Sequence, residues 1–472
     1  MNIQHHSIKR NLFYSILYQV IAIIVPLITT PYISRVLGAA PLGVYSYNYT
    51  MASYFVAFAM LGLGNYGNRE VAKAKNDQTN LNNLISEVYL FQFIHTLIIT
   101  SIYLIYCFTI ADNTIGALCA GIYVISTLFD ISWILNGLEE FKFITIRSAI
   151  VKVVSAICLF VFVKQPEDVY LYICIICLSV LLSNLSAIPI AYRSGIRLQK
   201  TTLRKAYKHA LPILILFVPF LGISIYKYIN KILLSNMVSD YALGIFESSE
   251  RLILVPIAFV TALGNVMLPR MSENYALGSK NTLYYFEKSI YLAVASTSLI
   301  AFGAIGVMDE FVPLFYGPGF DECARIIPIL MMSTPFLAIA NVVRTQCLIP
   351  KSKDKEYVIS IFGGAIMDLM IVYFCIRHLE TVGAALAVSV TEFVVCGIQV
   401  WLSREEHIIP SVLKSFVFLV CGAVMALVIS NIHLSDNIIL NLTIKMGIGA
   451  LVYLALAGLY YFTQCNKGQK LI

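Results

Sequence analysis

The sequence is a succession of apolar runs, each long enough to cross a lipid bilayer as a helix. A span needs about 20 mainly apolar residues, because a backbone in lipid must satisfy its own hydrogen bonds. We predict an all-α polytopic membrane protein with 12–14 transmembrane helices, and 14 fits best. The predicted helices begin near Asn11, Gly43, Leu84, Asn113, Arg147, Val169, Leu211, Leu243, Lys288, Arg325, Tyr357, Val382, Ser411 and Ile438.

Composition supports this prediction. The chain is 59% hydrophobic and 12% charged, whereas soluble proteins carry roughly 25% charged residues. The net charge of +7 is spread along the chain, so it does not indicate a nucleic-acid partner. The first apolar run lacks a clear cleavage site, and we interpret it as a helix rather than a signal peptide.

The Lys and Arg residues predict the orientation. With the N-terminus inside, the outside loops hold only Arg35, Lys164 and Arg377, with Arg325 at a boundary. The inside loops hold the rest of the loop cations, including the basic connection from Arg193 to Lys208, Lys280, the group Lys351, Lys353 and Lys355, and Lys467 and Lys470. Cytoplasmic loops are enriched in Lys and Arg. We therefore predict a multi-pass protein of the bacterial inner membrane with both termini cytoplasmic, and a basic connection that lies along the anionic leaflet.

The two halves of the chain resemble each other. Leu-Gly-Asn motifs occur at 63–65 and 263–265, and the distances from Gly43 to Arg69 and from Gly244 to Arg270 are equal. The helices concerned would run in the same direction, which predicts a parallel repeat of the kind that places a substrate site between halves. We predict domains at 1–200 (helices 1–6), 201–402 (helices 7–12) and 403–472 (two additional C-terminal helices).

Charged residues inside predicted spans mark the candidate site, because each costs several kcal/mol unless it faces water or a partner. The densest group contains Lys227, Lys231, Glu247, Glu250 and Arg251. One interpretation is that these residues neutralise one another and that Lys231 reaches the surface. The other is a water-filled chamber whose cations hold an anionic headgroup such as a phosphate.

Other residues in the spans are further candidates. Arg344 could add to the cationic lining or extend toward the surface, and Arg69 and Arg270 could pin an inner gate or anchor helix ends. The carboxylates Asp130, Asp368 and Glu392 could carry H⁺ or Na⁺ or serve only as hydrogen-bond partners.

Enzyme motifs are missing from the sequence. There is no GxxxxGK[ST] phosphate loop, no HExxH and no paired Cys/His spacing. No loop is long enough to hold a catalytic domain. We predict that the chain is not an enzyme and binds no metal cofactor. The sequence leaves open whether H⁺ or Na⁺ acts as a coupling ion.

Several segments, in order, carry a family resemblance. TPYISRVLGAAPLGVYSY from Thr30, NYGNREVAK from Asn65, VMLPRMSENYALG from Val266, FYGPGFDECARIIPIL from Phe315, LIPKSKDKEY from Leu348 and GAALAVSVTEF from Gly383 resemble loops of the Wzx-type oligosaccharide flippases. These form the polysaccharide transporter family of the multidrug/oligosaccharidyl-lipid/polysaccharide exporter superfamily. The resemblance covers nearly the whole chain, although each piece alone is loose.

The resemblance implies two six-helix bundles around a central cavity, plus two C-terminal helices. It also implies that undecaprenyl-diphosphate-linked oligosaccharide repeat units move from the cytoplasmic to the outer leaflet by alternating access, for O-antigen or capsule assembly. Partner polymerase and glycosyltransferases would accompany such a flippase. By the same resemblance Lys227, Lys231 and Arg251 would contact the diphosphate, and Tyr45, Tyr47 and Asn48 could touch sugars.

Two rival functions remain open. A drug/cation antiporter of the same superfamily would favour buried carboxylates over a cationic chamber. A membrane-embedded polymerase or acyltransferase would typically need a large outside loop with catalytic residues, and the sequence has none.

Overall fold

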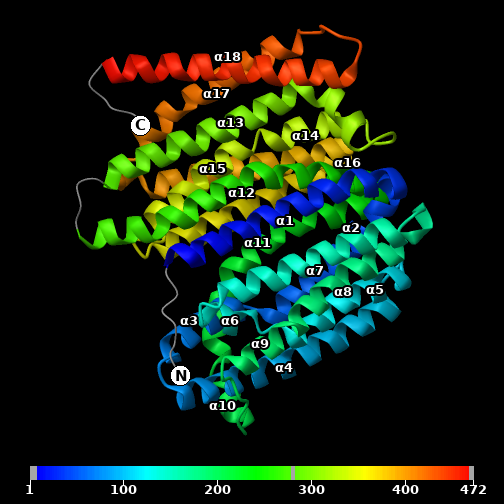
Figure 1. Ribbon diagram of the computed structural model, residues 1–472, viewed down its shortest axis with the longest axis vertical. Helices are drawn as coiled ribbons and strands as arrows, with labels where there is room; N and C mark the ends of the chain where they lie inside the picture. Colours follow the sequence, from blue (N-terminus) through cyan, green and yellow to red (C-terminus); the bar gives the residue numbers. More distant parts are fainter. Residues whose placement is uncertain (1–7, 278–281, 467–472) are drawn as a thin grey trace. The chain divides into compact units, whose positions relative to one another are not determined.

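The computed structural model describes residues 8–277 and 282–466, and within them every regular element is a helix (Figure 1). This confirms the predicted all-α fold. The predicted cytoplasmic termini, with Lys467 and Lys470, and the loop cation Lys280 lie outside the described residues. The chain divides into two compact units, Met1–Ile232 and Leu233–Ile472, and each is described by itself.

Unit 1 contains the helices from α1 to most of α11. Their bounds are α1 Ile8–Leu37, α2 Ala39–Met60, α3 Leu63–Ala74, α4 Gln78–Thr109, α5 Thr114–Ser126, η1 Thr127–Phe129, α6 Ser132–Gly137, α7 Phe141–Phe162, η2 Pro166–Asp168, α8 Val169–Leu185, α9 Ala187–Arg193, α10 Leu203–Tyr207 and α11 Ala210–Met237. Helix α1 packs on α7, α5 packs on α2 and α8, and α3 packs on α4 and α6.

Unit 2 contains α12 and all later helices. Their bounds are α12 Asp240–Ala276, α13 Thr282–Phe315, α14 Cys323–Met331, α15 Thr334–Val343, the π-helix η3 Arg344–Leu348, α16 Asp354–Leu402, η4 Arg404–Glu406, α17 Ile409–Ser430 and α18 Ile438–Asn466. Helix α13 packs on α14, α15, α17 and α18, and Figure 1 shows α17 and α18 on its outer side. The two helices predicted beyond the second bundle therefore dock on α13.

The described residues form fourteen crossing helices, which confirms the predicted number. Ten helical segments are long and apolar enough by themselves, α1 and α2 meet at a bend of 118°, and Thr114–Phe129 is a shorter apolar helix. The fourteenth comes from α16, because Glu380 has a non-helical backbone (φ 50°, ψ −123°). Thr391 bonds to Asp368 and Gln399 bonds to Ser360. Residues on the two sides of Glu380 therefore meet in antiparallel order, and α16 is a helical hairpin.

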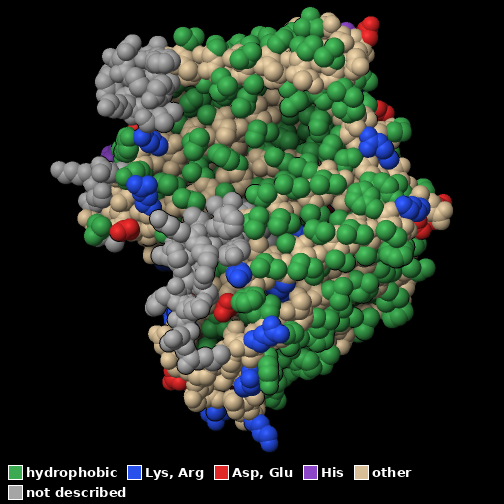
Figure 2. Space-filling model, viewed as in Figure 1, with side chains coloured by type: hydrophobic (Ala, Val, Ile, Leu, Met, Phe, Trp, Pro, Cys, Tyr) green, Lys and Arg blue, Asp and Glu red, His purple; other side chains and the backbone are tan. Residues whose placement is uncertain are grey.

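Apolar side chains cover the helices along their length, and Lys and Arg side chains gather mainly near helix ends (Figure 2). Ile105, Phe108 and Leu451 are each more than 60% exposed. A soluble protein rarely exposes apolar surface so continuously. The described surface is therefore that of a multi-pass membrane protein.

A break separates α2 from α3 in unit 1. Leu61 adopts a positive φ of 46°, which is uncommon for a residue with a side chain. A Cβ on Gly62 would lie 2.4 Å from the Ile213 carbonyl oxygen and 2.8 Å from Leu216 Cβ. Only glycine lets α11 approach this closely, so the break and the position of α11 depend on each other.

A buried polar network fixes a second break in unit 1, between α5 and α6. Gln92, fully buried on α4, donates to the backbone oxygens of Thr127 (2.8 Å) and Asp130 (2.9 Å) and accepts from Trp133 Nε1 (3.0 Å). Asp130 accepts from the Ser132 hydroxyl and backbone N–H. The network satisfies carbonyls that the interrupted helix leaves free.

Candidate functional site

Lys227 and Lys231 lie one turn apart on α11, inside a candidate span. Lys227 is exposed and lies 5.7 Å from the centroid of the Tyr228 ring, whereas Lys231 is 8% exposed. A buried ammonium group in a span costs about 2.5–3.5 kcal/mol without compensation. Both lysine side chains thus belong to the membrane-spanning part of unit 1.

Tyrosine rings extend from this helix through unit 1. Tyr228 meets Tyr54 edge-on at 5.0 Å, and Tyr49 stacks on Tyr123 at 5.0 Å and on Tyr45 at 5.5 Å. These residues belong to α2, α5 and α11, so the aromatic contacts tie the three helices together.

Asn48 lies where α2 packs on α5. Its side chain is 3% exposed and donates from Nδ2 to the Val44 carbonyl at 2.8 Å. A Cβ on Gly116 would lie 2.7 Å from Asn48 Nδ2. The geometry places Asn48 in a helix contact, and its role toward sugars stays a prediction.

Glu247 and Arg251 form an ion pair within α12 of unit 2. Arg251 Nε lies 3.3 Å from Glu247 Oε1, and both side chains are mostly buried. Tyr316, also buried, donates to the Ser248 carbonyl at 2.7 Å. The neutralisation foreseen for this group is therefore present between Glu247 and Arg251, while Glu250 and Arg251 each make further interactions.

Arg344 begins the π-helix η3 and lies 5.9 Å from the centroid of the Tyr357 ring. It also interacts electrostatically with Glu392 on α16, and Glu392 with Asp368. Asp368 is fully buried and accepts from Thr391 Oγ1 at 3.1 Å. Unit 2 thus brings together three of the residues that the sequence singled out, one cation and two carboxylates.

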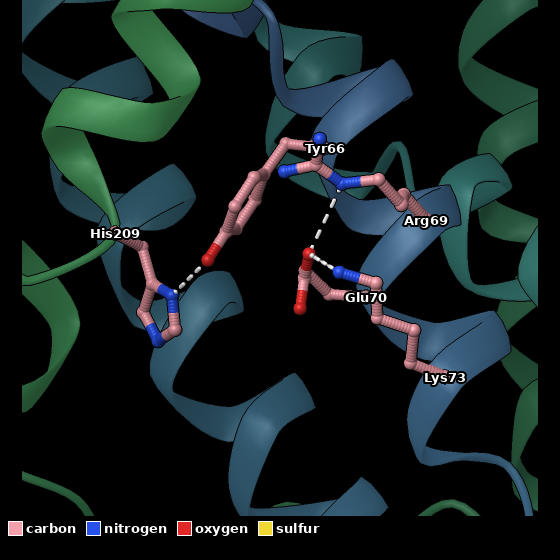
Figure 3. Close-up of polar contacts among 5 residues, drawn as sticks. All are labelled: Tyr66, Arg69, Glu70, Lys73 and His209. Carbon is pink, nitrogen blue, oxygen red and sulfur yellow. Dashed lines mark hydrogen bonds and ion pairs between the residues drawn. The ribbon is translucent and has the colours of Figure 1, made fainter.

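The two predicted gating arginines both lie beside tyrosines. Arg69 pairs with Glu70 on its own helix at 3.1 Å, Lys73 joins the same carboxylate at 2.9 Å, and the Arg69 side chain is 52% exposed (Figure 3). Arg270 stacks on the Tyr285 ring at 4.2 Å and donates to its hydroxyl at 2.9 Å. Their gating role stays a prediction.

A cluster around His209, the residue before α11, was not predicted from the sequence. Its Nδ1 lies 2.5 Å from the Tyr66 hydroxyl (Figure 3) and its Nε2 lies 3.1 Å from Glu87 Oε2, which Lys208 also approaches at 2.7 Å. The imidazole thus links Tyr66 of α3 to Glu87 of α4 through its two ring nitrogens. The one available signal was Glu87, a carboxylate inside the apolar run of α4.

Within residues 8–277 and 282–466, no group of three or more His, Cys, Asp or Glu side chains is placed to hold a metal ion. Charged residues that the sequence singled out contact one another, as Glu247 and Arg251 do, or an aromatic ring, as Arg270 does with Tyr285.

Comparison with solved structures shows which known membrane proteins share this fold. The lipid II flippase MurJ in an inward closed conformation matches 96% of this chain and 99% of its own, with a TM-score of 0.75 and 16% identity. The multidrug transporter DinF-BH of the MATE class gives a TM-score of 0.53 at 14% identity over 86% of this chain and 97% of its own. The chain shares the fold of this lipid II flippase and, less closely, that of this multidrug transporter.

The sequence comparisons give the family. The family described as "Polysaccharide biosynthesis protein" matches residues 8–275, more than half of the chain. The chain belongs to this family. Proteins named "Putative O-antigen transporter" from Shigella dysenteriae and Escherichia coli (strain K12) are each 22% identical, over 82% and 87% of this chain and 98% and 100% of their own lengths.

These comparisons confirm the resemblance seen in the sequence, and the prediction that the chain is not an enzyme. The named relatives are transporters, and the structural neighbours are transporters and a flippase.

Proposed function

We propose that this protein is a flippase for lipid-linked oligosaccharides in surface polysaccharide biosynthesis. Its substrate would be an undecaprenyl-diphosphate-linked repeat unit, carried by alternating access from the cytoplasmic to the outer leaflet of the bacterial inner membrane. Both termini would then be cytoplasmic, and a polysaccharide polymerase and glycosyltransferases would act with it.

The observation that carries the proposal is the difference between the two structural likenesses. The match to the lipid II flippase has a TM-score of 0.75 and includes 96% of the chain, whereas the multidrug transporter reaches 0.53 over 86%. The names of the curated relatives point the same way. This favours a lipid-linked glycan over a small drug cation as the cargo.

The charges in the spans suit an anionic headgroup. Lys227 and Lys231 place two cations on one face of α11, and no acidic residue occurs in that helix. A diphosphate needs cationic partners in a low-dielectric environment, while a polyprenyl tail can stay in lipid. We assign the diphosphate to these two lysines of unit 1.

The coupling ion is a separate part of the proposal. Asp368 is fully buried beside Glu392 on the α16 hairpin, and intramembrane carboxylates commonly carry protons or cations in transporters. Asp368 and Glu392 are the residues we assign to H⁺ or Na⁺ coupling. The same pair is also the feature that favours the antiporter alternative.

The test follows lipid-linked repeat units in each leaflet of a strain that lacks this gene. Loss of surface glycan together with cytoplasmic accumulation of repeat units is the expected result. If single units reach the outer leaflet but stay unpolymerised, the protein acts after translocation and the proposal fails. If glycan is normal but drug susceptibility rises, the antiporter function takes its place.

Complementation then tests the lysines. K227Q/K231Q is expected to abolish transport, and K227R/K231R to retain it, because arginine keeps the charge. The control is K142Q/K355Q, which removes two exposed cations outside the proposed site and should complement fully. Normal transport by K227Q/K231Q at equal membrane abundance would remove the diphosphate assignment.

A further inference from the structure

The connection between α9 and α11 is strongly cationic. Residues 193–208 contain six Lys or Arg residues and no Asp or Glu. The cations are Arg193, Arg197, Lys200, Arg204, Lys205 and Lys208, and all six are exposed. Figure 2 shows Lys and Arg side chains gathered where Figure 1 places α10. We refer to residues 193–208 as the basic connection.

The basic connection is held in place along α4. Gln78 donates to the Gly195 carbonyl at 2.9 Å, Asn82 accepts from the Arg197 backbone N–H at 3.1 Å, and Ser86 Oγ accepts from the Gln199 backbone N–H at 2.7 Å. These partners are spaced one turn apart on α4. The segment between α9 and α10 is therefore an ordered part of unit 1.

The segment has one buried and one exposed face. Ile196 and Ala206 belong to the hydrophobic core of unit 1. On the other face Leu198 is 63% exposed, Leu203 58% and Tyr207 47%. These large apolar side chains alternate with the cations, a composition typical of segments that lie in a membrane interface.

Lys208 is the one cation of the six that forms an ion pair within the described residues. Lys208 pairs with Glu87, and Arg197 bonds to the Tyr192 carbonyl and stacks on its ring at 3.5 Å. In the described part of the chain, Arg193, Lys200, Arg204 and Lys205 form no ion pair. In unit 2, by contrast, Lys351 and Lys353 both pair with Glu406.

We infer that the basic connection is a binding surface for the anionic phospholipid headgroups of the bilayer. Lys200, Arg204 and Lys205 contact the phosphates, and Leu198, Leu203 and Tyr207 enter the boundary between headgroups and acyl chains. Basic segments beside a membrane gain roughly 1 kcal/mol per Lys or Arg from anionic lipids. The inference is independent of the cargo that the protein transports.

A soluble phosphate fits this surface less well. Its cations are distributed along an extended segment on one side of α4, and exposed leucines separate them. A small anion would need converging donors and has no use for apolar neighbours. A bilayer surface offers many phosphates in a plane and an apolar layer beneath them.

Fluorescence quenching in nanodiscs tests the inference with the full chain. L198W introduces a tryptophan at the exposed face, and the signal of Trp133 and Trp401 is subtracted with the parent chain. Brominated phosphatidylglycerol should quench the added tryptophan more than brominated phosphatidylcholine at equal mole fraction. Adding K200Q/R204Q/K205Q should lower this preference roughly tenfold or more. The matched triple K142Q/K355Q/R404Q removes three exposed cations elsewhere and should leave it unchanged.

Three outcomes would overturn the inference. Equal quenching by the two lipids would show no selectivity for anionic headgroups. An unchanged preference in K200Q/R204Q/K205Q would place the selectivity elsewhere on the chain. Release of quenching by millimolar inorganic pyrophosphate, at constant ionic strength, would identify a site for a soluble phosphate.

Discussion

The two units use related sequence to build different interiors. In unit 1, Leu-Gly-Asn at 63–65 begins α3 after the break at Leu61 and Gly62. In unit 2, Leu-Gly-Asn at 263–265 lies inside the unbroken helix α12. The difference lies in the preceding residues, because Gly62 lets a neighbouring helix approach the backbone within contact distance. Similar motifs therefore do not give similar helix geometry.

The two units also differ in how their buried glutamines are hydrogen-bonded. Gln92 of unit 1 has three hydrogen-bond partners for its amide, whereas Gln346 of unit 2, also fully buried, has none among the described residues for either amide atom. Gln346 lies in the π-helix η3, an element often found at functional sites. At these two positions, the amide in unit 1 is fully hydrogen-bonded and the amide in unit 2 is not. A rearrangement would break fewer hydrogen bonds around Gln346 than around Gln92.

The largest expected effect comes from G62A. The new Cβ would meet backbone atoms of α11 at 2.4 Å and 2.7 Å, and backbone cannot move aside easily. We expect a loss of about 3 kcal/mol, as for a severe overpacking, measured by thermal unfolding of the purified protein in detergent.

Matched glycines sharpen this result. G64A meets nothing within 4 Å and should leave the melting temperature nearly unchanged. G264A in unit 2 meets the side-chain oxygen of Asn341 at 2.7 Å and should fall between the two. If G62A and G64A have the same melting temperature, the close approach of α11 is not what fixes the break between α2 and α3.

The next effect separates the two glutamines. Q92L would leave the Trp133 N–H and the carbonyls of Thr127 and Asp130 buried without partners, which should cost about 2 kcal/mol. Q346L removes an amide that has no hydrogen bond to lose and should be neutral or stabilising. Chemical unfolding of both variants measures the difference, and equal losses would contradict the contrast between the units.

A smaller change is expected at the break itself. Leu61 holds a φ of 46°, which glycine adopts with less strain. L61G should therefore relieve up to about 1 kcal/mol of backbone strain. The loss of the Leu61 side chain, which packs against the core of unit 1, offsets part of this gain. A clear loss of stability in L61G would show that the Leu61 side chain matters more than its backbone strain.

The smallest effect concerns Glu406, between α16 and α17. Burial raises the pKa of this carboxyl, but hydrogen bonds from Lys351 and Lys353 outweigh burial and leave it below its ordinary value. The stabilisation is thus present above the unfolded pKa, about 4.3, and is lost as the pH falls through the folded pKa. The melting temperature of the parent chain should fall more than that of E406Q below pH 5. Parallel curves would exclude a contribution from Glu406.

The sequence predicted the helix order well, because spacing of apolar runs and of loop cations is a strong signal. The two breaks differ in this respect. The turn at Glu380 was predictable, because the mainly polar residues 377–381 separate the helices predicted to begin near Tyr357 and Val382. The positive φ of Leu61 was not predictable, because it goes with the close approach of α11 to Gly62, which no polar segment marks.

The candidate site was predictable only as a set of residue types. Apolar surroundings identified Lys231, Asp368 and Glu392 as charges in spans. The contacts of His209 with Tyr66 and Glu87 join residues more than 120 positions apart, and no local pattern reports such a meeting. For the same reason the contact of Asn48 with Gly116 could not be predicted from the sequence.

The last helices carry a consequence for biosynthesis. Lys445 on α18 is 6% exposed and lies 2.5 Å from Glu310 of α13, which also accepts from Asn441 at 2.8 Å. An ammonium group within a span opposes membrane insertion by about 2.5–3.5 kcal/mol when alone. Because α18 is made after α13, its partner carboxylate is already in the membrane when Lys445 arrives. We therefore expect α18 to insert more readily once α13, which carries Glu310, is already in the membrane.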